Sequence, residues 1–151
     1  MRIDYSFFAI GAEVSPEGRL HVFGGEIGGM GFPAFPSMPT TLTLVIKLLA
    51  APNKIGQPRT ISLTYRLRGE NQPILHRQDL TVRPGANRMD MLADSGVIII
   101  AQIGVRFENP GVYEIGIESD NVVLRSVPFY VSHAQPDASH PSESHSVTVR
   151  N

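Results

Sequence analysis

Two glutamates are the first candidates for chemistry in this sequence. Glu114 and Glu118 alternate with apolar residues, so a strand here would place both carboxylates on its polar face. Paired carboxylates perform acid–base catalysis in glycosidases, where the two groups flank the scissile bond. A solvated strand face also uses such charges for solubility, and we favour that interpretation. A carbohydrate-active function is therefore kept only as an alternative.

Other catalytic and ligand-binding motifs do not fit the sequence. The glycine-rich segment 24–31 has neither dinucleotide-binding nor phosphate-loop spacing, and the prolines after it exclude the helix that such a loop requires. No Gly-x-Ser-x-Gly elbow and no calcium loop occur. The chain has no cysteine, and its five histidines match no zinc spacing. We therefore predict a protein that is not an enzyme and that holds no metal or cofactor.

Arginines form the first candidate binding surface. Residues 54–88 include seven basic residues and two acids, a net +5, whereas residues 89–120 include six acids and one arginine, a net −5. Arg66 and Arg68 share one strand face and Arg77 lies on the next strand, where planar guanidinium groups would suit carboxylate or phosphate. The alternative is that basic and acidic strands neutralise one another. Nucleic-acid binding is not expected, because no aromatic residue shares this face.

Residues 28–39 form the second candidate binding surface, which we expect to be one long loop. The segment combines glycines and prolines with Met30, Phe32, Phe35 and Met38. Loops on rigid sandwiches commonly bind partners, and exposed Phe and Met side chains together make a recognition patch. The alternative is that Phe32 and Phe35 close one end of the sandwich.

The elements that position these residues are predicted to be β-strands. Apolar and polar residues alternate with period two in 42–48, 59–68 and 113–117. Turn residues at 15–18 and 119–121 separate such runs. The first half of the run 97–107 is apolar on both faces, which predicts a central, covered strand.

Length and composition favour one folded domain with a tail. The chain has 151 residues, of which 42% are hydrophobic and 18% charged, and its net charge is −1. Fourteen glycines and twelve prolines indicate many turns. We predict an all-β sandwich of about seven to nine strands over residues 1–132. Residues 133–151 lack apolar periodicity and are predicted to be a flexible polar tail.

Residues 109–115 resemble the tyrosine corner of immunoglobulin-like domains. In that Asp-x-Gly-x-Tyr-x-Cys pattern, a tyrosine near the start of the penultimate strand hydrogen-bonds back across the corner. Asn109, Gly111 and Tyr113 stand at the Asp, Gly and Tyr positions, and Ile115 replaces the cysteine. The resemblance implies an immunoglobulin-like antiparallel sandwich and no particular function.

Four segments together resemble one family along the whole chain. They are residues 1–9, residues 13–20, the pair Gly24-Gly25 and residues 110–113. On these segments the chain is similar to a family of small, uncharacterised bacterial proteins, a domain of unknown function. The resemblance implies a bacterial protein with an immunoglobulin-like fold, and it transfers no catalytic residue.

These observations predict a non-enzymatic protein-binding or assembly module. The partner would be another protein or a second copy of the chain, bound through the 28–39 segment, the arginine face or a free sheet edge. The candidate binding residues are Met30, Phe32, Phe35, Arg66, Arg68 and Arg77. A cytoplasmic location is expected, because neither a secretory signal nor an apolar window of membrane-spanning length occurs. A carbohydrate-binding sandwich is the alternative, although the chain has no tryptophan platform.

Overall fold

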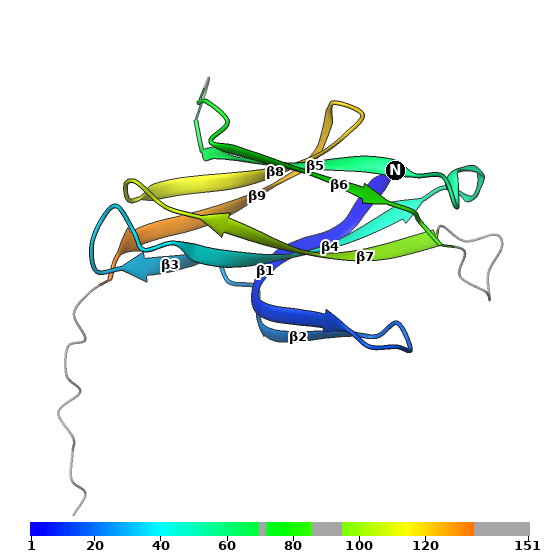
Figure 1. Cartoon of the computed structure of the whole chain (residues 1–151), viewed down its shortest axis with the longest axis horizontal. Coiled ribbons are helices and arrows are strands. Elements are labelled where there is room, and N and C mark those ends of the chain that lie inside the picture. Colours follow the sequence, from blue (N-terminus) through cyan, green and yellow to red (C-terminus); the bar gives the residue numbers. More distant parts are fainter. Residues whose placement is uncertain (70–71, 86–94, 135–151) are drawn as a thin grey trace, which may run out of the picture.

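The computed structural model describes residues 1–69, 72–85 and 95–134, and these residues form strands almost throughout (Figure 1). The only helical turn among them is a short 3₁₀ turn at Pro52–Lys54. No helix in the described part of the chain has the length and hydropathy needed to cross a membrane. The strands are β1 (Arg2–Val14), β2 (Leu20–Gly25), β3 (Gly29–Phe32), β4 (Thr40–Ala50), β5 (Arg59–Leu67), β6 (His76–Val82), β7 (Ser95–Val105), β8 (Gly111–Ser119) and β9 (Val122–His133).

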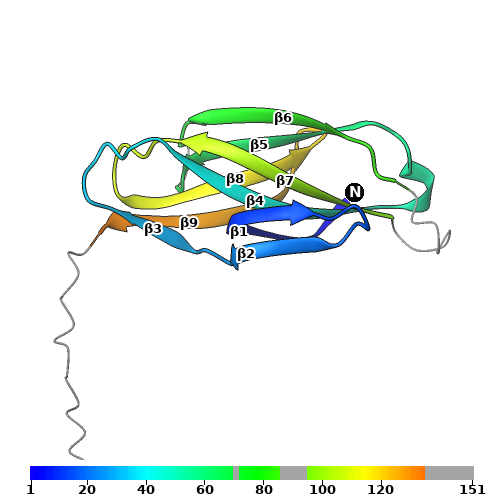
Figure 2. The ribbon, with the colours of Figure 1, turned by 60° about the horizontal axis from the view of Figure 1, so that its bottom comes forward.

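The nine strands form two sheets that pack face to face as a β-sandwich (Figure 2). The first sheet, sheet A, has the strand order β2-β1-β4-β7, and the second, sheet B, has the order β3-β9-β8-β5-β6. Neighbouring strands are antiparallel except β3 and β9, which run parallel. The predicted all-β sandwich of seven to nine strands is confirmed.

The alternation in β4 explains how the sandwich is held together. Leu42, Leu44, Ile46 and Leu48 point to one face of sheet A and are at most 3% exposed. Side chains on a strand alternate between faces, so one apolar phase is enough to line one side of the core. The core is completed by inward residues of the other strands, among them Phe8, Ile61, Leu63, Ile103, Phe107, Ile115, Ile117 and Phe129.

Strand β7 is an edge strand, and the prediction of a central, covered strand is wrong. Its neighbour on one side is β4, and it ends the order of sheet A. Val97, Ile98, Ile99 and Ile100 are all half-buried. Both faces are apolar for another reason: Ile98 and Ile100 belong to an outer surface of sheet A that is itself largely apolar.

Strand β1 divides its length between two partners. Residues 2–9 pair with β4, and residues 9–14 pair with β2. The resulting β1–β2 hairpin extends beyond the other strands (Figure 1). Its predicted turn is confirmed by a 2.8 Å hydrogen bond in which the Gly18 amide donates to the Ser15 carbonyl.

The predicted tyrosine-corner contact is present at the start of β8, the penultimate strand. The Tyr113 hydroxyl donates a 2.7 Å hydrogen bond to the Asn109 carbonyl. The Tyr113 ring is buried and lies edge-on to Phe107, with 5.0 Å between the ring centroids. The hydroxyl therefore fixes the loop before β8 while the ring fills the core.

The 28–39 segment is not one loop, because its first part forms β3. Gly29 pairs with Tyr130 and Phe32 with His133 in the parallel ladder. A Cβ atom at Gly29 would collide with the Tyr130 carbonyl, so this close approach requires glycine. His133 is the last residue of β9. Most of the predicted tail, residues 135–151, lies outside the described residues, as do residues 86–94.

Candidate binding surfaces

The aromatic side chains of the 28–39 segment close one end of the sandwich. Phe32 and Phe35 are half-buried and pack against the core, as does Met30. The Phe32 ring centroid lies 5.5 Å from that of Phe107, and the Phe35 centroid lies 4.9 Å from that of His133. This arrangement matches the end-closing alternative stated for these two residues.

A small apolar hollow lies on the outside of the same end. Its walls belong to Phe32, Pro33, Ala34, Pro36, Met38, Pro39 and Thr40. Met38 is 80% exposed, whereas Ser37 beside it is buried. The Ser37 hydroxyl accepts a 3.0 Å hydrogen bond from the Phe107 amide. This bond fixes the 28–39 segment at Ser37, next to Met38. Of this segment, Met38 is the apolar side chain most available to a partner.

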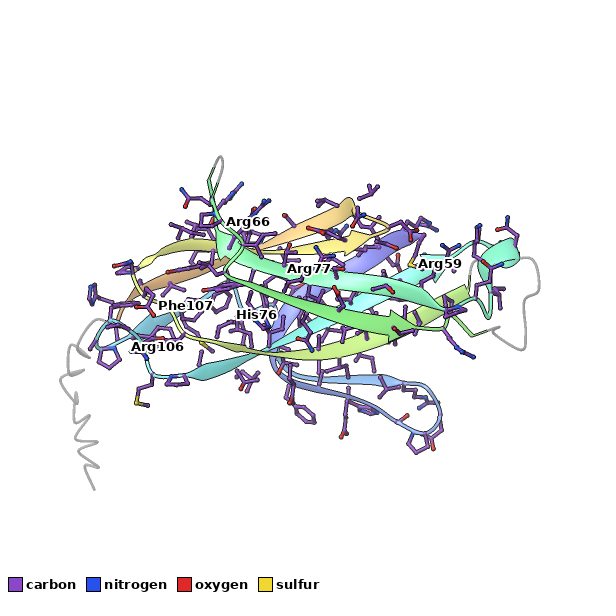
Figure 3. All side chains as sticks on the ribbon, turned by 45° about the horizontal axis from the view of Figure 1, so that its top comes forward. Arg59, Arg66, His76, Arg77, Arg106 and Phe107 are labelled. Carbon is purple, nitrogen blue, oxygen red and sulfur yellow. The ribbon has the colours of Figure 1, made fainter. Side chains whose placement is uncertain are left out.

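The predicted arginine face is on the outer side of sheet B and is largely neutralised by acids. Arg66 Nε lies 2.6 Å from Glu114 Oε1, on the neighbouring strand β8. Arg77 lies 3.2 Å from Asp79 and 3.8 Å from Glu118. Figure 3 shows Arg66 and Arg77 beside β5 and β6. Arginines of the basic segment 54–88 thus form ion pairs with acids of the segment 89–120 on other strands of sheet B.

Arg68 differs from the other two arginines. Its backbone amide donates a 2.7 Å hydrogen bond to the Val112 carbonyl, and its side chain is exposed. Among the described residues, no acid lies within ion-pair distance of its guanidinium group. The three arginines do not form a joint anion-binding site, because Arg66 and Arg77 already bind carboxylates.

The acids on this face belong to a hydrogen-bonded polar network. The Thr64 hydroxyl donates a 3.1 Å bond to Glu118, and Arg77 donates a 2.8 Å bond to the Ser62 hydroxyl. Thr64 is only 2% exposed, although it lies on the outer face. A hydrogen bond from Ser62, together with Arg77, lowers the pKa of Asp79 below its ordinary value. Glu114 and Glu118, the candidate catalytic pair, are therefore already bound by neighbouring donors.

The two predicted surfaces do not meet. Met30 and Phe32 lie opposite Val131 and His133 and point between the sheets. Arg66 pairs with Glu114 on the outward phase of sheet B. A single site formed from both groups is therefore not present.

An exposed apolar surface on the β1–β2 hairpin was not predicted from the sequence. On the β1–β2 hairpin, Ile10 is 76% exposed and Phe23 58%, and Val14 and Val22 are exposed as well. The strand register places Ile10, Val14 and Val22 on one face of the hairpin and Phe23, which lies opposite Gly11, on the other face. We call these four residues, which expose apolar surface on both faces of the hairpin, the hairpin patch. In the sequence, the apolar residues of this hairpin alternate with polar or small residues as in an ordinary half-buried strand. The sequence contains no signal that this hairpin extends past the sheet that would cover it.

A second apolar surface adjoins the hairpin on the outer face of sheet A. Phe7, Val45 and Ile100 lie in register across β1, β4 and β7. Val45 is fully buried there, although it points away from the core. Lys47 belongs to the same face, where it lies 3.1 Å from Asp4. The face is thus apolar over much of its area, with this ion pair toward one end.

Within ranges 1–69, 72–85 and 95–134, no group of three or more His, Cys, Asp or Glu side chains is placed to hold a metal ion. Tyr65 and Tyr113 are buried in the core, whereas Tyr130 is 56% exposed. One exposed tyrosine is a small platform for stacking a sugar ring.

Comparison with known proteins identifies the family of the chain. Residues 4–132 match the model of the family of unknown function DUF6941, so the chain belongs to that family. The predicted resemblance to a domain of unknown function is confirmed. No curated protein matches the chain. The matched range runs from β1 to β9, which places the whole sandwich within the family.

Proposed function

We propose that this member of a family of unknown function is a non-enzymatic module that binds a protein partner through the hairpin patch. The supporting observation is the exposure of Ile10 and Phe23 on a hairpin that extends beyond the sandwich. Ile10 and Phe23 lie on opposite faces of the hairpin, so a partner that receives the hairpin in a groove would bury both. Exposed large apolar side chains on a protruding element are typical of recognition surfaces. Binding that buries both side chains would gain about 25 cal/mol of free energy for each Å² of apolar surface removed from water.

The state of the acidic residues supports a function other than catalysis. A general acid or base must exchange its proton with a substrate in the transition state. Glu114 is held by Arg66 at 2.6 Å, and Glu118 accepts from Thr64 at 3.1 Å. These contacts occupy carboxylate oxygens that a substrate would need.

The strand order supports an immunoglobulin-like assignment as part of the proposal. β1, β4 and β7 share one sheet, and β5, β8 and β9 share the other. Immunoglobulin-like domains divide their A, B and E strands from their C, F and G strands in the same way.

The proposal also places the protein in a bacterial cytoplasm. A fold without cysteine needs no oxidising compartment for its stability.

The proposal is tested by capture of a partner with matched variants. The intact chain and the variants Ile10→Ser/Phe23→Ser and Met38→Ser would serve as bait, with bound proteins identified by mass spectrometry. Binding of the identified partner is then measured by titration. We expect the hairpin variant to bind at least about tenfold more weakly, and Met38→Ser to bind as the intact chain does. Equal binding by the intact chain and the hairpin variant would refute the assignment of the site.

A further inference from the structure

Strand β7 has one side without a strand partner. It pairs with β4 along its whole length, from the Thr40–Val105 pair to the Ala50–Ser95 pair. On its other side, the described residues provide neither a strand nor a backbone hydrogen bond. Alternate N–H and C=O groups of an eleven-residue strand therefore face outward, as in a template for another strand.

The other three sheet edges have features that discourage strand addition. Charged or polar edges, short edge strands and irregular backbone all block pairing with a further strand. β6 includes Arg77 and Asp79, and β3 has only four residues. β2 ends in two glycines, of which Gly24 has a left-handed backbone. Strand β7 contains no charged residue and no proline, so it is the long edge that lacks such protection.

We propose that β7 pairs in antiparallel fashion with β7 of a second copy, across a two-fold axis near Ile100. This inference goes beyond the proposed function and does not depend on the hairpin patch. A two-fold axis pairs each residue with its counterpart at equal distance on the other side of the centre. Ile100 is the midpoint of β7, so that Ile98 would lie opposite Gln102.

The second copy is favoured over an unrelated strand by chemical self-complementarity. In a pairing about Ile100, the two residues of each pair are both even-numbered or both odd-numbered. Residues that face the core therefore lie beside residues that face the core in the second copy. It brings no like charges together, and the whole chain has a net charge of only −1. The outer residues Ile98 and Ile100 would then continue the apolar face of sheet A into the second copy. The product is one continuous sheet of eight strands.

The first test is the association state of the full chain. Sedimentation velocity over a wide range of concentration is expected to show a monomer–dimer equilibrium. Ile100→Lys places two ammonium groups at the axis, and Gln102→Lys adds a charge at an exposed position that folding tolerates. Each should weaken the dimer at least about tenfold. Thr41→Lys adds the same charge to the same face of sheet A but on interior strand β4, and should leave the dimer intact.

The second test uses the absence of cysteine from the chain. Single cysteines introduced one at a time from Ile98 to Gln102 can form a disulfide only where a residue meets its own copy. Oxidation is expected to cross-link one position in this window strongly and its neighbours weakly, with Phe23→Cys on the hairpin patch as the control. Circular dichroism and thermal unfolding establish that each variant is folded.

The proposal would be overturned by a monomer at every concentration, by a dimer that the edge lysines do not weaken, or by uniform cross-linking across the window and at Phe23. Capture of a strand from a different protein by β7 would also refute the second copy as its occupant. Loss of partner binding in the hairpin variant, with the dimer preserved, would leave both proposals standing. Failure of one is therefore distinguishable from failure of the other.

Discussion

Two stacked tyrosines in the core differ in how their hydroxyl groups are satisfied. The rings of Tyr65 and Tyr113 are nearly parallel, with centroids 5.4 Å apart. The Tyr113 hydroxyl donates to Asn109, whereas the buried Tyr65 hydroxyl has no hydrogen-bond partner among the described residues. Burial, with a smaller contribution from Tyr113, raises the pKa of Tyr65 well above its ordinary value.

This difference predicts opposite effects for the same substitution. Tyr113→Phe should lower the free energy of unfolding by about 1 kcal/mol, because it removes a hydrogen bond from a buried ring. Tyr65→Phe should leave that free energy unchanged or raise it, because it removes a buried polar group that makes no bond. Urea unfolding measures the free energy of unfolding of both variants, and each variant is the control for the other. An equal loss of stability in both would contradict the different hydrogen bonding of the two hydroxyl groups.

Gly116 is a second residue whose role can be tested singly. A Cβ atom at this position would lie 2.6 Å from the Thr64 hydroxyl oxygen, within the polar network of sheet B. Gly116→Ala should therefore displace Thr64 and lower the free energy of unfolding by about 1–3 kcal/mol. Gly28→Ala is the matched control, because nothing lies within 4 Å of its added methyl group and the position lies outside β7. Chemical denaturation should separate the two variants clearly, and equal stability would rule out the steric role.

At the scale of elements, the β8–β9 hairpin shows a turn whose backbone is set by two residues. Asp120 and Asn121 have φ values of 52° and 61°, which are the left-handed values of a type I′ turn. Asn121→Gly should preserve or raise stability, since glycine adopts this conformation freely. Asn121→Val should lower it by about 1–2 kcal/mol, because a β-branched residue is strained there. Thermal unfolding of the two variants measures the difference, and the opposite ranking would exclude this turn type.

The elements also show what could be predicted from the sequence. Strands such as β4 and β8 were predicted correctly, because a period of two reports directly on which face is buried. Position within a sheet was not, because the apolar run of β7 has the same pattern in a central strand and in an edge strand with an apolar outer face. The arginine face was located, yet pairing of Arg66 with Glu114 depends on strands that are distant in sequence. Phe23 was missed because extension of a hairpin beyond a sheet leaves no local signal.

At the scale of the whole molecule, association should depend little on salt. The surfaces proposed for assembly are apolar, and the charges of sheet B pair within one copy, as between Arg66 and Glu114. Salt screens charge–charge attraction but leaves apolar burial in place. The dimer is therefore expected to persist when sedimentation is repeated in 1 M salt, a concentration at which the Debye length is only about 3 Å. Dissociation under those conditions would indicate instead that opposite charges on different copies attract one another.

The parallel pairing of β3 with β9 also has a consequence in time. Synthesis proceeds from the N-terminus, so β3 leaves the ribosome early, whereas its only partner among the described strands is the last of them. Sheet B cannot reach its final width until nearly the whole described chain has emerged. β4 and β5 are complete well before that, and their apolar faces then lack their final cover. Closing the sandwich thus has to wait for the synthesis of β9, and the nascent chain is most exposed to aggregation just before that point.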